Sequence, residues 1–102
     1  MAFATLPDPD IQPPTTPTNF RYTKVYGPDD YPATVTLEWD ASTDNTAVTG
    51  YKVLIDGNIL DIGNSSAYVY TISSRGTSSV YIRAYDAAGN QSQWSPALKV
   101  RV

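Results

Sequence analysis

The chain contains no cysteine and no histidine in its 102 residues. Without cysteine it forms no disulfide and offers no thiolate nucleophile, so its stability must come from a hydrophobic core. Without histidine it lacks the side chain whose pKa suits acid–base catalysis near neutral pH. Glutamate is nearly absent as well, because Glu38 is the only one, and its alternation with Leu37 and Trp39 is typical of a solvated strand residue. We therefore expect no catalytic residue and no enzymatic activity.

Long apolar runs and excess positive charge are also missing. No run approaches the roughly 18 apolar residues of a membrane span. The net charge is −3, and Asp8 and Asp10 have no basic partner within the first eighteen residues. An acidic chain with dispersed Lys and Arg is a poor candidate for nucleic-acid binding. Carboxylates cluster only at Asp29–Asp30 and at Asp40 with Asp44, without the alternating ligands and closing glutamate of a calcium loop. We therefore expect no metal and no cofactor.

Residues 1–18 are rich in proline and hold five of the eight prolines of the chain. Proline fixes φ and removes a backbone donor, so this stretch should be an extended arm or linker before a domain over 19–102. One interpretation is a solvated linker. The other is an arm that lies along another subunit, because Phe3, Leu6 and Ile11 would give it apolar anchors that a simple spacer does not need. The opening MAFATL is too short, and lacks the basic start, for a secretory signal.

From Asn19 onward, apolar and polar residues alternate in short runs separated by turn residues. Alternation with a period of two is the pattern of a strand with one buried face. Tyr26–Ala33 is expected to be a loop, and Asp56-Gly57-Asn58 a tight turn. The predicted strands are Phe20–Val25, Thr34–Asp40, Thr49–Asp56, Ile59–Ile62, Ala67–Ile72, Ser78–Asp86 and Trp94–Val102. Seven short strands without helical periodicity predict an all-β sandwich.

The inward positions of these strands predict the core. Its expected members are Phe20, Val35, Leu37, Trp39, Tyr51, Val53, Val80 and Ile82. Trp39 should contribute most, because a buried tryptophan removes roughly 150–250 Å² from water, worth ~4–6 kcal/mol as an upper bound. The facing of Ala67–Ile72 stays open, since either Tyr68, Tyr70 and Ile72 or the alternate residues could point inward.

Several segments resemble a fibronectin type III domain, especially the bacterial and phage versions. They are Pro14-Thr-Thr-Pro17-Thr-Asn-Phe20, Val35-Thr-Leu37-Glu-Trp39, Ala41-Ser-Thr-Asp44-Asn, Val48-Thr-Gly50-Tyr51-Lys-Val53, Asp56-Gly57 and Ala84-Tyr-Asp86-Ala-Ala-Gly89-Asn90. The resemblance covers residues 14–102 and implies a three-stranded and a four-stranded sheet packed face to face. It departs from the family at the tyrosine corner, where this chain has Ser78, so that Tyr68 or Tyr70 would have to fill the space. The Asp86–Asn90 loop carries no Arg-Gly-Asp, which gives integrin-type adhesion no support.

One candidate binding surface is aromatic. Tyr81, Arg83 and Tyr85 should project outward from one strand, beside Trp94 of the next. The segment Ser92-Gln-Trp94-Ser95 resembles half of the WSxWS motif of cytokine receptors, which implies that Trp94 stacks on Arg83. Such a set is either an internal structural stack or a recognition patch for a protein or for sugar rings, since Tyr, Trp and Arg are typical of binding hot spots.

Three hypotheses for function follow. We expect a non-catalytic virion subunit, a phage capsid decoration or tail protein on the virion surface. Its arm would bind capsid or tail subunits, and its sandwich could contact surface glycans. The resemblance to displayed phage domains and the start at Met1 without a signal peptide favour it. The alternative is a spacer or accessory, weakly carbohydrate-binding module of a secreted, extracellular bacterial glycan-degrading enzyme. An enzyme in its own right is the least favoured of the three.

Overall fold

The computed structural model describes residues 12–28, 30–45 and 47–102, and this part of the chain forms seven strands and no helix. The strands are β1 (Thr18–Gly27), β2 (Asp30–Asp40), β3 (Val48–Ile55), β4 (Asn58–Gly63), β5 (Ala67–Ile72), β6 (Thr77–Asp86) and β7 (Leu98–Arg101). Because the described residues contain no helix, none of them forms an apolar helix of membrane-spanning length.

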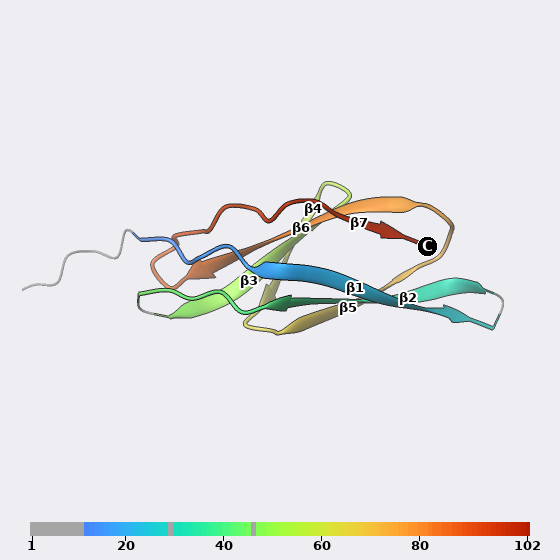
Figure 1. Cartoon of the computed structure of the whole chain (residues 1–102), viewed down its shortest axis with the longest axis horizontal. Coiled ribbons are helices and arrows are strands. Elements are labelled where there is room, and N and C mark those ends of the chain that lie inside the picture. Colours follow the sequence, from blue (N-terminus) through green and yellow to red (C-terminus); the bar gives the residue numbers. More distant parts are fainter. Residues whose placement is uncertain (1–11, 29, 46) are drawn as a thin grey trace, which may run out of the picture.

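Two antiparallel sheets pack face to face (Figure 1). One has the strand order β1-β2-β5, and the other has the order β4-β3-β6-β7. The alternation of apolar residues is what forces this arrangement, because each sheet has one apolar face that only the other sheet can cover. The predicted all-β, seven-stranded sandwich is confirmed, including its division into three and four strands.

The core lies between the sheets. Seven of the eight predicted members are buried, with Trp39 only 5% and Tyr51 only 2% exposed. Their rings lie 5.3 Å apart at a tilt of 58°. Phe20 is partly buried instead, because it lies in the register shift of the edge strand β1 between Thr18 and Arg21 and covers the rim of Trp39 at 6.3 Å. Sequence alternation also left out Ala33, Val100 and Val102, which are buried as well.

The structure decides the facing of β5. Tyr68, Tyr70 and Ile72 pack against the core, while the alternate residues are exposed. The rings of Tyr68 and Tyr70 stack at 6.1 Å. The Tyr70 hydroxyl is buried and finds no hydrogen-bond partner among the described residues. Burial, followed by the negative charge of Asp56, raises the pKa of Tyr70 to about 12.

The expected loop Tyr26–Ala33 is wrong. β1 and β2 continue as a hairpin through this stretch, pairing Tyr26 with Ala33 and Gly27 with Asp30. The rings of Tyr26 and Tyr31 pack edge to face at 5.9 Å, which stabilises strand pairing where Pro and Gly had suggested a break.

The tight turn after β3 is confirmed: Asp56 and Gly57 both have positive φ, 49° and 85°, as a two-residue type I′ turn requires.

No tyrosine corner forms in the described residues. Ser78, at the expected place, donates from its hydroxyl to Asp56 Oδ2 at 3.1 Å. Neither Tyr68 nor Tyr70 ties back to the backbone there. A different tyrosine anchors a loop, because the buried Ser42 N–H donates to the Tyr51 hydroxyl at 3.0 Å.

Candidate functional site

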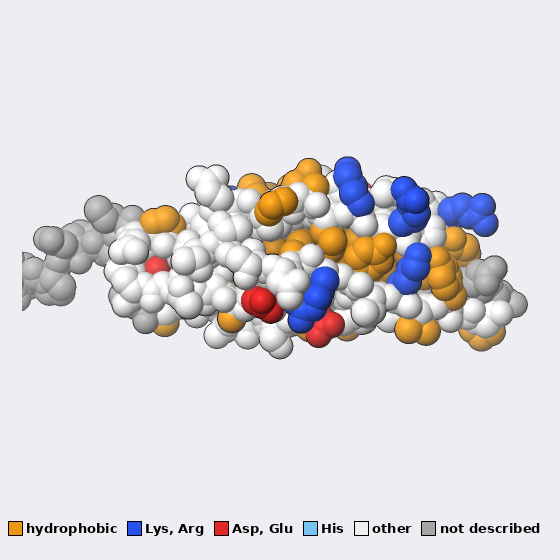
Figure 2. Space-filling model, viewed as in Figure 1, with side chains coloured by type: hydrophobic (Ala, Val, Ile, Leu, Met, Phe, Trp, Pro, Cys, Tyr) orange, Lys and Arg blue, Asp and Glu red, His pale blue; other side chains and the backbone are white. Residues whose placement is uncertain are grey.

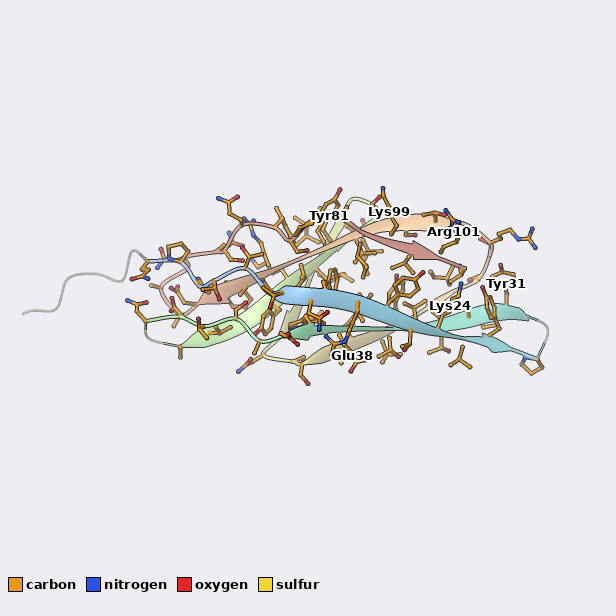
Figure 3. The ribbon with its side chains drawn as sticks, in the orientation of Figure 1. Lys24, Tyr31, Glu38, Tyr81, Lys99 and Arg101 are labelled. Carbon is orange, nitrogen blue, oxygen red and sulfur yellow. The ribbon has the colours of Figure 1, made fainter. Side chains whose placement is uncertain are left out.

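The predicted aromatic patch, defined as Tyr81, Arg83, Tyr85 and Trp94, lies on the outer face of the four-stranded sheet. Its first three members alternate along β6 with the buried Val80, Ile82 and Ala84, and each is half-buried. Figure 3 labels Tyr81 on the outer side of this strand. Trp94 follows in the segment between β6 and β7 and is also half-buried.

Arg83 and Trp94 form the stack that the serine-tryptophan segment predicts. The guanidinium carbon of Arg83 lies 4.4 Å from the centroid of the Trp94 ring. Its Nε and Nη2 both donate to the carbonyl oxygen of Ser92, at 3.0 and 2.8 Å. A cation–π contact of this kind is worth about 0.5–1 kcal/mol when exposed and more when desolvated. The stack therefore fastens the segment before β7 to the outer face of β6.

Two serines fasten the same segment from beneath. The buried Ser92 and Ser95 each donate a backbone N–H to β6, to Ala84 and Ile82 respectively, both at 2.8 Å. Their hydroxyls accept the N–H groups of the same two residues at 2.9 and 3.0 Å. The two hydroxyl oxygens thus accept the N–H groups of β6 that the backbone carbonyls of a regular neighbouring strand would accept. The predicted strand Trp94–Val102 is therefore wrong in its first half, and β7 begins only at Leu98.

Tyr85 belongs to a second cluster on this face. It pairs with Gly50 across β3 and β6, and a Cβ placed on Gly50 would lie 2.6 Å from the Tyr85 Cζ. The ring thus covers the bare glycine backbone. The Tyr85 hydroxyl donates to Asp61 Oδ1 at 2.8 Å, and Lys52 Nζ lies 5.4 Å from the ring centroid.

These contacts couple two pKa values. The hydrogen bond to Asp61 raises the pKa of Tyr85. The Gly63 amide, and then the Tyr85 hydroxyl, lower the pKa of Asp61. Sequence reasoning missed Lys52 and Asp61, although the pairing of Lys52 with Arg83 across the sheet follows from strand register.

A buried carboxylate organises the turn after β6. Asp86 is 2% exposed, and its Oδ1 accepts the N–H groups of Ala88 and Asn90 at 3.0 and 2.9 Å. The Asn90 side chain donates to Oδ2 at 3.0 Å. Short acidic side chains commonly fix turns in this way. Asp86 and Asn90 are among the residues that carry the fibronectin type III resemblance, and their hydrogen bonds hold the turn after β6 together.

The patch offers contact surface and structural stacking rather than reactive groups. No three acidic, histidine or cysteine side chains gather in a way that could hold a metal ion within the part of the chain that the structure describes. Beside the patch, a groove of about 550 Å³ runs between residues 16–20 and 94–98 and is lined in part by Phe20 and Trp94. The expected arm anchors Phe3, Leu6 and Ile11 lie outside the described residues. Ligand recognition by the patch stays a prediction.

The architecture defines a seven-stranded β-sandwich domain, and its sequence relatives are bacterial. No protein-family model matches the chain. An alpha-amylase from Niallia circulans is 37% identical over 92 residues, which are 87% of this chain and 7% of that protein. Chitinase A1 from the same organism is 39% identical over 97 residues, which are 94% of this chain and 13% of that protein. Exoglucanase A from Cellulomonas fimi is 40% identical over 96 residues, which are 91% of this chain and 10% of that protein.

A solved structure shows the same fold. The spore cortex lytic enzyme SleM from Clostridium perfringens superposes with a TM-score of 0.68 at 16% sequence identity, over 99% of this chain and 31% of that protein. At this identity the likeness concerns the fold alone. The chain thus spans only a small part of the length of each of these relatives.

The comparisons correct the functional expectation. The hypothesis of a virion subunit, whether a phage capsid decoration or a tail protein displayed on the virion surface, is wrong. The matching relatives are an amylase, chitinases and exoglucanases instead. They favour the alternative, an accessory module of a glycan-degrading enzyme.

Proposed function

We propose that this chain is a non-catalytic fibronectin type III module that serves as a spacer in a secreted, extracellular bacterial glycan-degrading enzyme. The observation that carries the proposal is its 34–40% identity, over about nine-tenths of its length, to segments of two chitinases, an amylase and two exoglucanases. Fold alone would not give this function, since β-sandwiches of this kind have many roles.

The path of the chain through the sandwich supports a spacer. Residues 12–17 enter at one end, and Val102 lies toward the other end (Figure 1). A domain crossed in this direction would hold the parts before and after it apart. The paired strands of the two sheets and the buried core between them give the separation a fixed length, unlike a Gly/Ser linker of similar length.

The internal use of the aromatic side chains supports the same role. A sugar ring stacks on an open aromatic face, yet Arg83 covers one face of Trp94 and Lys52 approaches the ring of Tyr85. The Tyr85 hydroxyl is also engaged with Asp61. We therefore assign these residues to the stability of the module, which leaves neutral-glycan binding to other parts of the enzyme.

A replacement experiment tests the proposal. In Chitinase A1, this chain replaces the segment that it matches over 97 residues. The chimera is compared with unaltered Chitinase A1, the parent, and with a variant from which that segment is deleted. We expect equal rates on a soluble chitin oligomer for all three, and on insoluble chitin a rate for the chimera near the parent and above the deletion. A chimera no faster than the deletion on insoluble chitin, or hydrolysis by the isolated chain, would contradict the proposal.

A further inference from the structure

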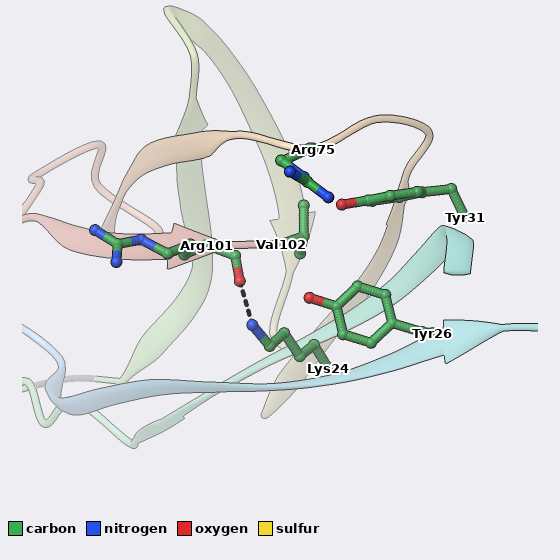
Figure 4. A pocket seen from close by; sticks show the side chains of 6 residues that line it. All are labelled: Lys24, Tyr26, Tyr31, Arg75, Arg101 and Val102. Atoms are coloured by element: carbon green, nitrogen blue, oxygen red, sulfur yellow. Dashed lines mark hydrogen bonds between the residues drawn. The ribbon is translucent and has the colours of Figure 1, made fainter. Parts of the chain in front are cut away.

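A separate group of side chains, away from both the aromatic patch and the Tyr85 cluster, surrounds a hollow of about 380 Å³ (Figure 4). It is built from β1, β2, the loop after β5 and the end of β7. Its lining residues are Lys24, Tyr26, Tyr31, Arg75, Arg101 and Val102. Nothing in the sequence patterns brought these residues together, because they come from four separate segments.

The polar ends of four of these side chains converge. Figure 4 shows the Arg75 guanidinium, the hydroxyls of Tyr26 and Tyr31 and the Lys24 ammonium directed into the same space. Lys24 Nζ donates to the carbonyl oxygen of Arg101 at 2.6 Å and lies 5.5 Å from the centroid of the Tyr26 ring. The Arg101 guanidinium points away from the hollow and adds only its distant positive charge.

The set is rich in donors, and none of its side chains is acidic. Three of the seven basic residues of the chain are among the lining residues, and no acidic side chain of the described part of the chain is. Figure 2 shows that Lys and Arg side chains gather toward this end of the sandwich. Lys and Arg can only donate hydrogen bonds. Among the described residues, the Arg75 side chain has no hydrogen-bond or ion-pair partner.

The backbone around the hollow is held in place. Gly76, next to Arg75, exchanges two hydrogen bonds with Val102 at 3.1 and 3.0 Å. The Arg101 N–H donates to the Tyr22 hydroxyl at 3.2 Å. The edge-to-face packing of Tyr26 and Tyr31 fixes the opposite wall. A ligand therefore meets a backbone and a tyrosine wall that are already positioned, which lowers part of the entropic cost of binding.

We infer that this hollow binds an acidic glycan through the carboxylate of a uronic acid unit. The carboxylate supplies acceptors for the Arg75 fork, for the two tyrosine hydroxyls and for the Lys24 donors that the Arg101 carbonyl oxygen does not take. Arg matches a carboxylate with two parallel hydrogen bonds. The tyrosine rings supply apolar surface for the sugar. The choice of a glycan rests on the proposed function, whereas the anion site rests on the side chains alone.

The test is a titration of the ¹⁵N-labelled chain with trigalacturonate, followed by amide chemical shifts. We expect shifts at Gly76, Arg101 and Val102, and an affinity that falls as salt rises. Arg75→Gln should weaken binding about tenfold or more, because a charged hydrogen bond is lost. The matched control is Lys99→Gln, which removes one positive charge from β7 outside the hollow, where Lys99 Nζ donates to Ser79 Oγ at 2.6 Å.

Four results would overturn the inference: no shifts at these amides, equal shifts with neutral chitotriose, an equal loss of affinity in Lys99→Gln, or inorganic phosphate binding as tightly as trigalacturonate. The titration does not depend on the spacer role. A chain that binds trigalacturonate but fails in the chitinase chimera keeps this site and loses the proposed function. The reverse result removes the site and leaves the spacer.

Discussion

Replacing Arg83 with methionine tests the structural reading of the aromatic patch. Methionine keeps an aliphatic stem but removes the charge and both donors to the Ser92 carbonyl, at 3.0 and 2.8 Å. A charged hydrogen bond contributes about 1.5–3 kcal/mol, and the cation–π contact at 4.4 Å from the Trp94 ring adds about 0.5–1 kcal/mol. Because Arg83 is half-exposed, we take the low ends and expect a loss of about 2 kcal/mol.

Urea unfolding of the Arg83→Met variant, followed by circular dichroism, measures this loss. In thermal unfolding, a loss of about 2 kcal/mol should lower Tm by about 8–16 °C in a domain of this size. Combining Arg83→Met with Trp94→Ala should give a loss smaller than the sum of the two single losses, by about 0.5–1 kcal/mol. The control is Arg21→Met, whose exposed ion pair with Asp40 at 3.5 Å should be worth at most about 0.5 kcal/mol.

The reasoning fails if Arg83→Met costs no more than the Arg21→Met control. It fails in a different way if the losses of Arg83→Met and Trp94→Ala simply add, because two residues in contact should be coupled. In the first case the hydrogen bonds to Ser92 contribute nothing to stability. In the second case the ring and the guanidinium do not interact in solution.

Three further substitutions test other parts of the fold. Ser95→Ala leaves the buried N–H of Ile82 without its side-chain acceptor and should cost about 1–3 kcal/mol in urea unfolding; a loss below about 0.5 kcal/mol would contradict the role of Ser95 in fastening the segment before β7 to β6. Tyr70→Phe should leave stability at pH 7 unchanged or raised, since the hydroxyl is buried without a partner among the described residues. The raised pKa of Tyr70, about 12, means that the unfolded chain ionises first, so the free energy of unfolding of the wild type should fall as pH rises from about 10 to about 12. That alkaline fall should be smaller in Tyr70→Phe, and an equal fall would refute the assignment. Gly50→Ala should push the Tyr85 ring aside, at about 1–2 kcal/mol, and the Tyr85 hydroxyl should then titrate closer to its ordinary pKa; an unchanged titration would mean that the ring does not lie over the glycine.

Strand alternation was enough to predict most of the core. Val35, Leu37, Val53 and Ile82 all fall on the inward period of their strands and are fully buried. The same pattern could not decide β5, because tyrosine suits either face of a strand. There the packing of the second sheet makes the choice, and no local pattern carries that information.

Local breaker residues misled the two boundary predictions. Pro and Gly within Tyr26–Ala33 suggested a loop, yet the Tyr26–Tyr31 contact continues the hairpin. In the last segment, Ser92 and Ser95 replace backbone acceptors with hydroxyls, which alternation cannot reveal. The WSxWS resemblance did predict the Arg83–Trp94 stack, because a specific spacing carries a specific contact.

The functional prediction failed for a different reason. The virion hypothesis rested on the apolar residues of the arm, on the start of the sequence and on the resemblance to domains that phages display, and none of these distinguishes a virion protein from an enzyme module. The relatives favour the alternative, which composition and fold could support only as one of several roles. The hollow around Arg75 was out of reach as well, since its residues meet only through the tertiary fold.

Adsorption of the isolated chain to insoluble chitin and cellulose tests most directly the claim that the aromatic patch stabilises a spacer. The chain is mixed with each solid at increasing concentration, and the protein left in solution is measured for the wild type and for Trp94→Ala. The account predicts no saturable adsorption and no difference between the two proteins, because Arg83 covers one face of the Trp94 ring and holds it in an internal stack. Saturable adsorption of the wild type that Trp94→Ala abolishes would show a glycan-binding patch and contradict the account.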